Sequence, residues 1–126
     1  MSKQKILIVE DDDVLSGVII DNLAQAGFST VRAKDGEEGL FMSLEEKPDL
    51  ILLDILLPKM DGLTVLKKLR EDEWGKNVKV MMLTNLGDAE NISKAIKQGS
   101  FDYILKSGWK IEDIVEKVKE RLTRDI

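Results

Sequence analysis

Acidic residues in this chain stand directly after runs of apolar residues. Glu10 and Asp11 follow the run Ile6–Val9, and Asp54 follows the run Leu50–Leu53. If the apolar runs are parallel strands, their carboxyl ends meet at one edge of a sheet, where such folds bind ligands. Carboxylates gathered there repel one another unless a cation joins them. A hard divalent ion with oxygen ligands is the expected partner, and Mg²⁺ is the usual one where phosphate is involved.

Two further polar residues end later apolar runs. Thr84 follows the run that ends at Leu83, and Lys106 follows the run that ends at Leu105. Each residue alone is ordinary, because threonine is common in strands and lysine is common on surfaces. Together with the acids, they predict a site that can accept a phosphoryl group.

Helix capping is the alternative interpretation of these acids. Aspartate is a good N-cap and acids suit the first turn of a helix, so Asp12 and Asp13 fit a structural role as well as a functional one. A cap is less favoured for Glu10 and Asp11. Asp54 is the hardest to explain in this way, because a carboxylate at the end of a wholly apolar strand is costly unless a cation or hydrogen-bond donors meet it.

The elements that must position these residues alternate along the chain. Short apolar runs predict strands, and apolar residues at helical spacing predict the helices between them. The strands are expected at 6–9, 29–33, 50–53, 78–83 and 102–105. Five βα units in 126 residues make an α/β fold with a single doubly wound parallel sheet the economical choice, as one domain over residues 1–126. The run 50–53 is apolar on both faces, which predicts a central strand.

Composition excludes several classes of function. Cysteine and histidine are absent, which removes disulfides, the usual zinc sites and His-based acid–base catalysis. The net charge of −5 argues against direct nucleic-acid binding, which needs a basic face. No apolar run approaches the length of a membrane span, and no secretory signal is expected. A cytoplasmic location is compatible with the lack of cysteine.

Other phosphate-binding machinery is absent as well. The chain has neither a GxxxxGKS/T loop nor a GxGxxG after the first strand, so nucleotide binding has no support. Asp54-Ile55-Leu56 lacks the second acid, two positions on, that aspartyl-phosphate phosphatases of the haloacid dehalogenase type carry. The residues therefore suit acceptance of a phosphoryl group better than its rapid turnover.

Five segments resemble the receiver domain of bacterial response regulators, and in this order they cover essentially the whole chain. They are Ile6–Asp12, Pro48–Asp54, Leu57–Gly62, Leu83–Thr84 and Asp102–Lys106. Any one of them is a weak signal, whereas the five together at this spacing are highly specific. The resemblance implies the CheY-like, flavodoxin-like fold, whose five parallel strands have the order 2-1-3-4-5.

The resemblance implies a phosphoryl-accepting signalling switch of a two-component phosphorelay. Such a protein is not a turnover enzyme, since it promotes only its own phosphorylation and slow dephosphorylation. Asp54 would accept the phosphoryl group from a phosphohistidine of a sensor histidine kinase or a histidine phosphotransferase. Mg²⁺, with Mn²⁺ as a substitute, would be bound by Asp11, Asp54 and the backbone carbonyl of Leu56, with Glu10 acting mainly through water. Lys106 would neutralise a phosphoryl oxygen.

The resemblance also implies how the signal leaves the site. The hydroxyl of Thr84 would move to the new phosphoryl group, and Tyr103 would turn inward after it. This would couple a local charge to the face formed by the fourth helix, fifth strand and fifth helix, where a downstream protein binds. A half-buried aromatic at the sheet edge is the alternative interpretation of Tyr103. The expected state is a monomer or a phosphorylation-dependent dimer.

The chain departs from the family beside the site. Ser107 stands where a proline with a cis peptide bond usually follows the lysine; because a cis bond without proline costs about 2.5–4 kcal/mol, a trans bond is expected there. Asn85 replaces a small residue and is expected to crowd the route to Asp54, which would slow small phosphodonors. Leu56 and Leu86 replace side chains that often orient the hydrolytic water, which predicts a long-lived phosphoryl group.

Two other functions are left open by the sequence. One is a module of the same fold that binds proteins without being phosphorylated. Asn85 and Ser107 favour it, whereas the complete set of predicted site residues disfavours it: Glu10, Asp11, Asp54, Thr84 and Lys106. The other is a small Mg²⁺-dependent phosphohydrolase, which the missing acid after Asp54 disfavours. The sequence identifies neither the kinase nor the downstream target, and it does not decide whether the chain acts alone or within a longer protein.

Overall fold

The computed structural model describes residues 3–84, 93–94, 96–97, 102–105 and 110–123. Its helices and strands, in chain order, are β1 (Lys5–Val9), α1 (Asp13–Gln25), β2 (Ser29–Ala33), α2 (Gly36–Glu46), β3 (Leu50–Asp54), α3 (Gly62–Arg70), β4 (Lys79–Thr84), β5 (Asp102–Leu105) and α5 (Ile111–Thr123). The strands form one parallel sheet in the order β2-β1-β3-β4-β5. The predicted doubly wound fold and its strand order are therefore confirmed.

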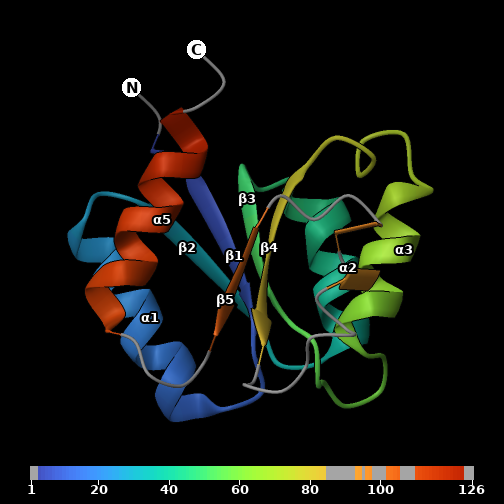
Figure 1. The fold of residues 1–126 in the computed structure, drawn as a ribbon, viewed down its shortest axis with the longest axis horizontal. Coiled ribbons are helices and arrows are strands. Elements are labelled where there is room, and N and C mark those ends of the chain that lie inside the picture. The colour runs from blue at the N-terminus through green and yellow to red at the C-terminus, as the bar shows by residue number, and fades with distance from the viewer. Residues whose placement is uncertain (1–2, 85–92, 95, 98–101, 106–109, 124–126) are drawn as a thin grey trace.

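The sheet lies between two layers of helices (Figure 1). α1 and α5 contact each other on one face, and α2 and α3 contact each other on the other face. Residues 93–94 and 96–97 are helical and lie between β4 and β5, where a helix is expected. The rest of that segment lies outside the described residues.

The central strands are apolar at nearly every position, so helices can cover both faces of the sheet. In β1, Ile6 and Ile8 pack toward α1 and α5, whereas Leu7 and Val9 pack toward α2 and α3. β3 alternates in the same way, and all five of its residues are buried. This burial confirms the prediction of a central strand and leaves its last residue, Asp54, inside the protein.

The strand limits differ slightly from the predicted ones. β1 begins one residue earlier, at Lys5, and β3 and β4 each include the polar residue that follows the apolar run. Asp54 pairs with Leu83, and Thr84 pairs with Leu105. Pairing continues because ladder hydrogen bonds join backbone groups, whatever the side chain. The two polar residues are thus held by the sheet itself.

α1, α2 and α3 each begin after a capping aspartate. The side chain of Asp12 accepts hydrogen bonds from the N–H groups of Val14 and Leu15, at 2.9 and 3.0 Å. Asp35 and Asp61 cap α2 and α3 in the same manner. The capping interpretation is therefore confirmed for Asp12. Such caps satisfy N–H groups of the first turn and fix where each strand-to-helix turn ends.

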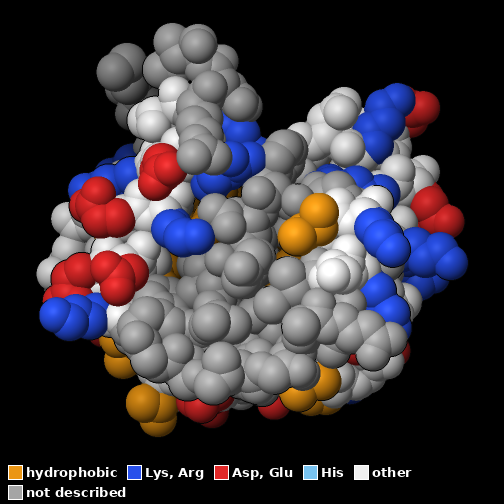
Figure 2. All heavy atoms as spheres, in the orientation of Figure 1, with side chains coloured by type: hydrophobic (Ala, Val, Ile, Leu, Met, Phe, Trp, Pro, Cys, Tyr) orange, Lys and Arg blue, Asp and Glu red, His pale blue; other side chains and the backbone are white. Residues whose placement is uncertain are grey.

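The charged surface differs between the helices. Figure 2 shows acidic and basic side chains interspersed over α5, and Lys and Arg gathered over α3, whose last turn carries Lys67, Lys68 and Arg70.

Within the part of the chain that the structure describes, no helix combines the length and apolarity needed to cross a membrane.

Candidate functional site

Glu10, Asp11 and Asp54 come together at the carboxyl edge of the sheet, the lower edge in Figure 1. One carboxylate oxygen from each residue lies within 4.8 Å of the other two. Glu10 is fully buried and Asp54 is 2% exposed, whereas Asp11 is exposed. The expectation that these acids gather at one edge is confirmed.

Strand geometry explains why Glu10 and Asp54 meet. Side chains alternate along a strand, so Glu10 lies on the face of Ile8 and Asp54 lies on the face of Leu52. β1 and β3 are neighbours, and Ile8 stands opposite Leu52 in their register. Glu10, directly after β1, and Asp54, the last residue of β3, each stand two residues beyond this pair. The two carboxylates therefore reach the same place on the face covered by α1 and α5.

The turn after β1 is held by a hydrogen bond within the turn and by another hydrogen bond to β2. The N–H of Glu10 donates to the carbonyl of Ala33 at 3.1 Å, and the N–H of Asp12 donates to Oε2 of Glu10 at 3.0 Å. Asp12 in turn caps α1. Asp11 lies between these two restrained residues and contributes its carboxylate to the cluster.

Arg32, on β2, is a residue of this region that sequence reasoning missed. Its Nε and Nη2 donate to the carbonyl oxygen of Glu10, at 3.3 and 2.9 Å, and its Nη1 lies 2.8 Å from Oδ1 of Asp13. The hydrogen bond and the charge of Arg32 hold the pKa of Asp13 below its ordinary value. The sequence does hold a signal for Arg32, because β2 is parallel to β1 and ends at the same edge of the sheet.

The turn after β3 lies tightly against Asp54. The N–H of Leu56 donates to Oδ1 of Asp54 at 3.3 Å, and the N–H of Gly62 donates to the carbonyl of Ile55 at 2.8 Å. A Cβ atom at position 62 would overlap the carbonyl oxygen of Asp54, so the close start of α3 requires glycine. The side chain of Leu56 is 58% exposed beside the site.

The remaining predicted residues are placed less fully. Thr84 is the last residue of β4, the neighbour of β3, and Tyr103 lies in β5 opposite Met82. The sheet therefore brings Thr84 to the same edge as Asp54, as the sequence predicts. Four residues on which predictions depend lie outside the described residues: Asn85, Leu86, Lys106 and Ser107. The trans bond before Ser107 accordingly stays a prediction.

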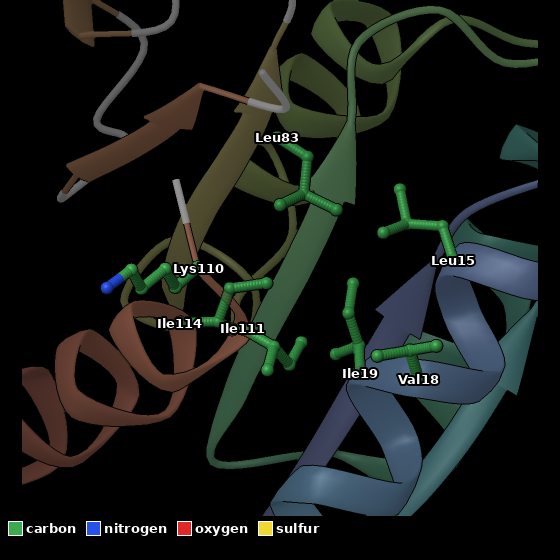
Figure 3. A pocket seen from close by; sticks show the side chains of 7 residues that line it. All are labelled: Leu15, Val18, Ile19, Leu83, Lys110, Ile111 and Ile114. Carbon is green, nitrogen blue, oxygen red and sulfur yellow. The ribbon is translucent and has the colours of Figure 1, made fainter. Parts of the chain in front are cut away.

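An apolar groove lies between α1 and α5, and its volume is about 190 Å³ (Figure 3). Its lining residues are Leu15, Val18, Ile19, Leu83, Lys110, Ile111 and Ile114. Leu83 pairs with Asp54 across the sheet, so the groove extends to the strand ends that carry the acids. Val14, which precedes Leu15 in α1, is 77% exposed.

The donor set of the cluster suits a hard divalent cation. Its three carboxylates supply oxygen ligands, which Mg²⁺ prefers. Two of the three are buried, and like charges in a buried site are costly unless a cation offsets them. The residues present therefore fit Mg²⁺, and the Asp54 carboxylate is also a potential nucleophile.

Comparisons with known proteins show which family the chain belongs to. The family model for the response regulator receiver domain matches residues 6–119. The DNA-binding dual master transcriptional regulator RpaA of Synechocystis is 38% identical over 120 residues, which cover 95% of this chain and 49% of that protein. The chain thus spans about half the length of the curated relatives it matches.

Two solved structures are similar over almost their whole length. A putative response regulator from Chloroflexus aurantiacus has a TM-score of 0.90 at 33% identity and covers 98% of this chain and 100% of its own. The receiver domain of sensor histidine kinase PA1611 from Pseudomonas aeruginosa, with a magnesium ion coordinated in its active site cleft, has a TM-score of 0.86 at 26% identity, covering 96% and 98%. From its strand order, its acidic cluster and the match over residues 6–119, the chain belongs to the response regulator receiver domain family of two-component signalling.

Proposed function

We propose that Asp54 accepts a phosphoryl group from a phosphohistidine on a sensor histidine kinase or a histidine phosphotransferase. The observation that carries the proposal is the buried Asp54 carboxylate at the end of β3, with Glu10 and Asp11 within 4.8 Å. A carboxylate oxygen of Asp54 attacks the phosphorus, an O–P bond forms as the P–N bond breaks, and the histidine nitrogen keeps the electron pair. The product is an acyl phosphate on Asp54.

Glu10, Asp11 and Asp54 are proposed to hold Mg²⁺, or Mn²⁺ in its place, with the backbone carbonyl of Leu56 as a further ligand. The all-oxygen donor set supports this, as does the magnesium ion in the cleft of the PA1611 receiver domain. When bound, the ion would supply positive charge that offsets the carboxylates and the charge of the phosphoryl group. Glu10, whose Oε2 accepts the N–H of Asp12, would act mainly through water.

Thr84 and Lys106 are proposed to complete the site. Thr84 ends the strand beside β3, and its hydroxyl would donate to a phosphoryl oxygen. Lys106 follows β5, and its ammonium would neutralise another phosphoryl oxygen. Tyr103, on β5, would then transmit the change to the face formed by the fourth helix, β5 and α5, where a downstream protein binds.

Exposed apolar side chains near the site favour a protein as the phosphoryl donor. Val14 and Val18 on α1 are 77% and 42% exposed, and Leu56 after β3 is 58% exposed. Covering such a side chain fully contributes about 1.5–3 kcal/mol. A kinase or phosphotransferase that covers these residues and the groove of Figure 3 would bring its phosphohistidine to Asp54.

The output of the switch is proposed to be a protein contact. RpaA is a DNA-binding regulator of about twice this length, whereas this chain carries a net charge of −5. We therefore expect the chain itself to bind proteins and no nucleic acid. It would act in the cytoplasm as a monomer or a phosphorylation-dependent dimer.

Leu56 is proposed to prolong the phosphorylated state. Its side chain offers no hydrogen bond to water beside Asp54, and Leu86 is expected to act in the same way. Leu56→Asn combined with Leu86→Asn should shorten the half-life of the acyl phosphate, followed by intact mass in Mg²⁺ buffer. Decay of the unaltered chain on the order of seconds would contradict a long-lived state.

Intact mass after treatment with phosphoramidate and Mg²⁺, or with a cognate kinase, tests the main proposal. The chain should gain one phosphoryl group, and Asp54→Asn should gain none. Asp12→Asn is the matched control, because asparagine caps a helix as well as aspartate does and the phosphoryl gain should persist.

Three results would contradict the proposal. A gain that survives Asp54→Asn would place the phosphoryl group elsewhere. No gain, even with a cognate kinase, would favour a module that binds proteins without phosphorylation. Steady release of phosphate over many cycles would favour a phosphohydrolase.

A further inference from the structure

We propose that Arg32 is a positioning residue for the cation site and holds the turn after β1 so that Glu10 and Asp11 present their carboxylates toward Asp54. The inference rests on the proposed function, because it assumes that these three acids bind Mg²⁺. Arg32 would act through the turn and not as a ligand, since a guanidinium has no acceptor atom for a cation.

The guanidinium contacts the turn after β1 and the first residue of α1. Nε and Nη2 donate to the carbonyl oxygen of Glu10, at 3.3 and 2.9 Å, and Nη1 lies 2.8 Å from Oδ1 of Asp13. The Glu10 carbonyl belongs to the planar peptide unit that joins Glu10 to Asp11. Holding this oxygen therefore restricts the direction in which Asp11 leaves the turn.

β2 gives Arg32 a rigid base for this role. Arg32 pairs with Ile8 in the sheet, two residues before Glu10. Ala33, the next residue of β2, is buried, and its carbonyl accepts the N–H of Glu10 at 3.1 Å. β2 thus holds both backbone groups of Glu10, one through its own backbone and the other through the Arg32 side chain. That side chain is 20% exposed, so these hydrogen bonds lie in a partly water-excluded place.

Charge and position predict opposite results when Arg32 is removed. A guanidinium near a cation site repels the cation, so a purely electrostatic role predicts tighter Mg²⁺ binding without it. A positioning role predicts weaker binding, because the turn must then be ordered when the cation binds. Lysine separates the two, since it keeps the charge but lacks the planar fork that reaches Glu10 and Asp13 together.

Magnesium affinity of the chelator-treated chain, measured by isothermal titration calorimetry, tests the inference. Arg32→Met keeps the aliphatic stem and is expected to weaken Mg²⁺ binding about 10-fold, the lower end of the range for residues that orient metal ligands. Arg32→Lys is expected to weaken it nearly as much. Asp13→Asn leaves the bond to the Glu10 carbonyl in place and is the matched control, expected within about twofold of the unaltered chain because exposed ion pairs contribute little.

Two outcomes would overturn the inference alone. One is Mg²⁺ binding by Arg32→Met that is as tight as that of the unaltered chain, or tighter, while urea unfolding in chelator shows that the two proteins are equally stable. The other is an Mg²⁺ affinity of Arg32→Lys equal to that of the unaltered chain, because the positive charge alone would then replace the contacts of the guanidinium. If Arg32→Met does not fold, the comparison of Arg32→Lys with Asp13→Asn decides. An unaltered chain that binds no Mg²⁺ would overturn the proposed function and this inference with it.

Discussion

Charged side chains are arranged differently at the two edges of the sheet. At the amino edge, Lys5 Nζ pairs with Glu46 Oε1 at 3.0 Å, and the two side chains stay 35% and 39% exposed. At the carboxyl edge, Glu10 and Asp54 are buried with Asp11 beside them. Opposite charges in water add a little stability, whereas like charges in a buried place reduce it. This difference supports the proposal that the carboxyl edge binds a ligand, whereas the ion pair at the amino edge adds to the stability of the fold.

The largest effect expected at the carboxyl edge comes from Gly62→Ala. The new Cβ would overlap the carbonyl oxygen of Asp54, and we expect the free energy of unfolding to fall by about 2–3 kcal/mol. Gly17→Ala is the matched control: a Cβ meets nothing within 4 Å in α1, and the change should stabilise by up to about 1 kcal/mol. Urea unfolding measures both, and equal effects of the two substitutions would refute the close packing at Gly62.

Addition of Mg²⁺ should raise stability through the carboxyl edge alone. At a concentration of about 100 Kd, a ligand that binds only the native state adds about 2.7 kcal/mol to the free energy of unfolding. Thermal unfolding with Mg²⁺ and with a chelator measures this gain. The gain should vanish in Asp11→Asn combined with Asp54→Asn and persist in Lys5→Met at the amino edge. A gain that survives the double substitution would place the ion elsewhere.

Without Mg²⁺, Asp54→Asn should stabilise the protein. Removing one of three neighbouring like charges should raise the free energy of unfolding by about 1–2 kcal/mol, part of the Coulomb energy at this separation in a medium of intermediate dielectric. Urea unfolding in chelator measures the change. Asp12→Asn, which keeps the cap of α1, should leave stability nearly unchanged. A loss of stability in Asp54→Asn would show that the carboxylate stabilises the ligand-free protein.

The smallest effect is expected at the amino edge. Lys5→Met removes the partly exposed pair with Glu46 and should lower the free energy of unfolding by no more than about 1 kcal/mol. A double-mutant cycle with Glu46→Gln, at low and high salt, measures the coupling, which salt should reduce further. A coupling above that range would remove the contrast between the two edges.

Local features of the sequence were enough to predict most of the fold. Apolar runs marked the strands, because a strand between two helical layers must be apolar on both faces. Asp12 could be predicted as a cap, since its partners, Val14 and Leu15, are its near neighbours in the chain. The ends of β3 and β4 are harder to predict from the sequence, because backbone pairing extends both strands to the polar residues that follow the apolar runs.

The sequence by itself determined that the acids after β1 and β3 would share one edge, because parallel strands in such a sheet end together. The tertiary structure alone decided two further features. Arg32 reaches the Glu10 carbonyl 22 positions away, and position 62 faces the carbonyl of Asp54. Both depend on the distance between atoms of different helices, strands and turns. Such a distance cannot be predicted from the types of the residues alone. The acids are therefore evident in the sequence, whereas the contacts that hold them in place appear once the sheet is assembled.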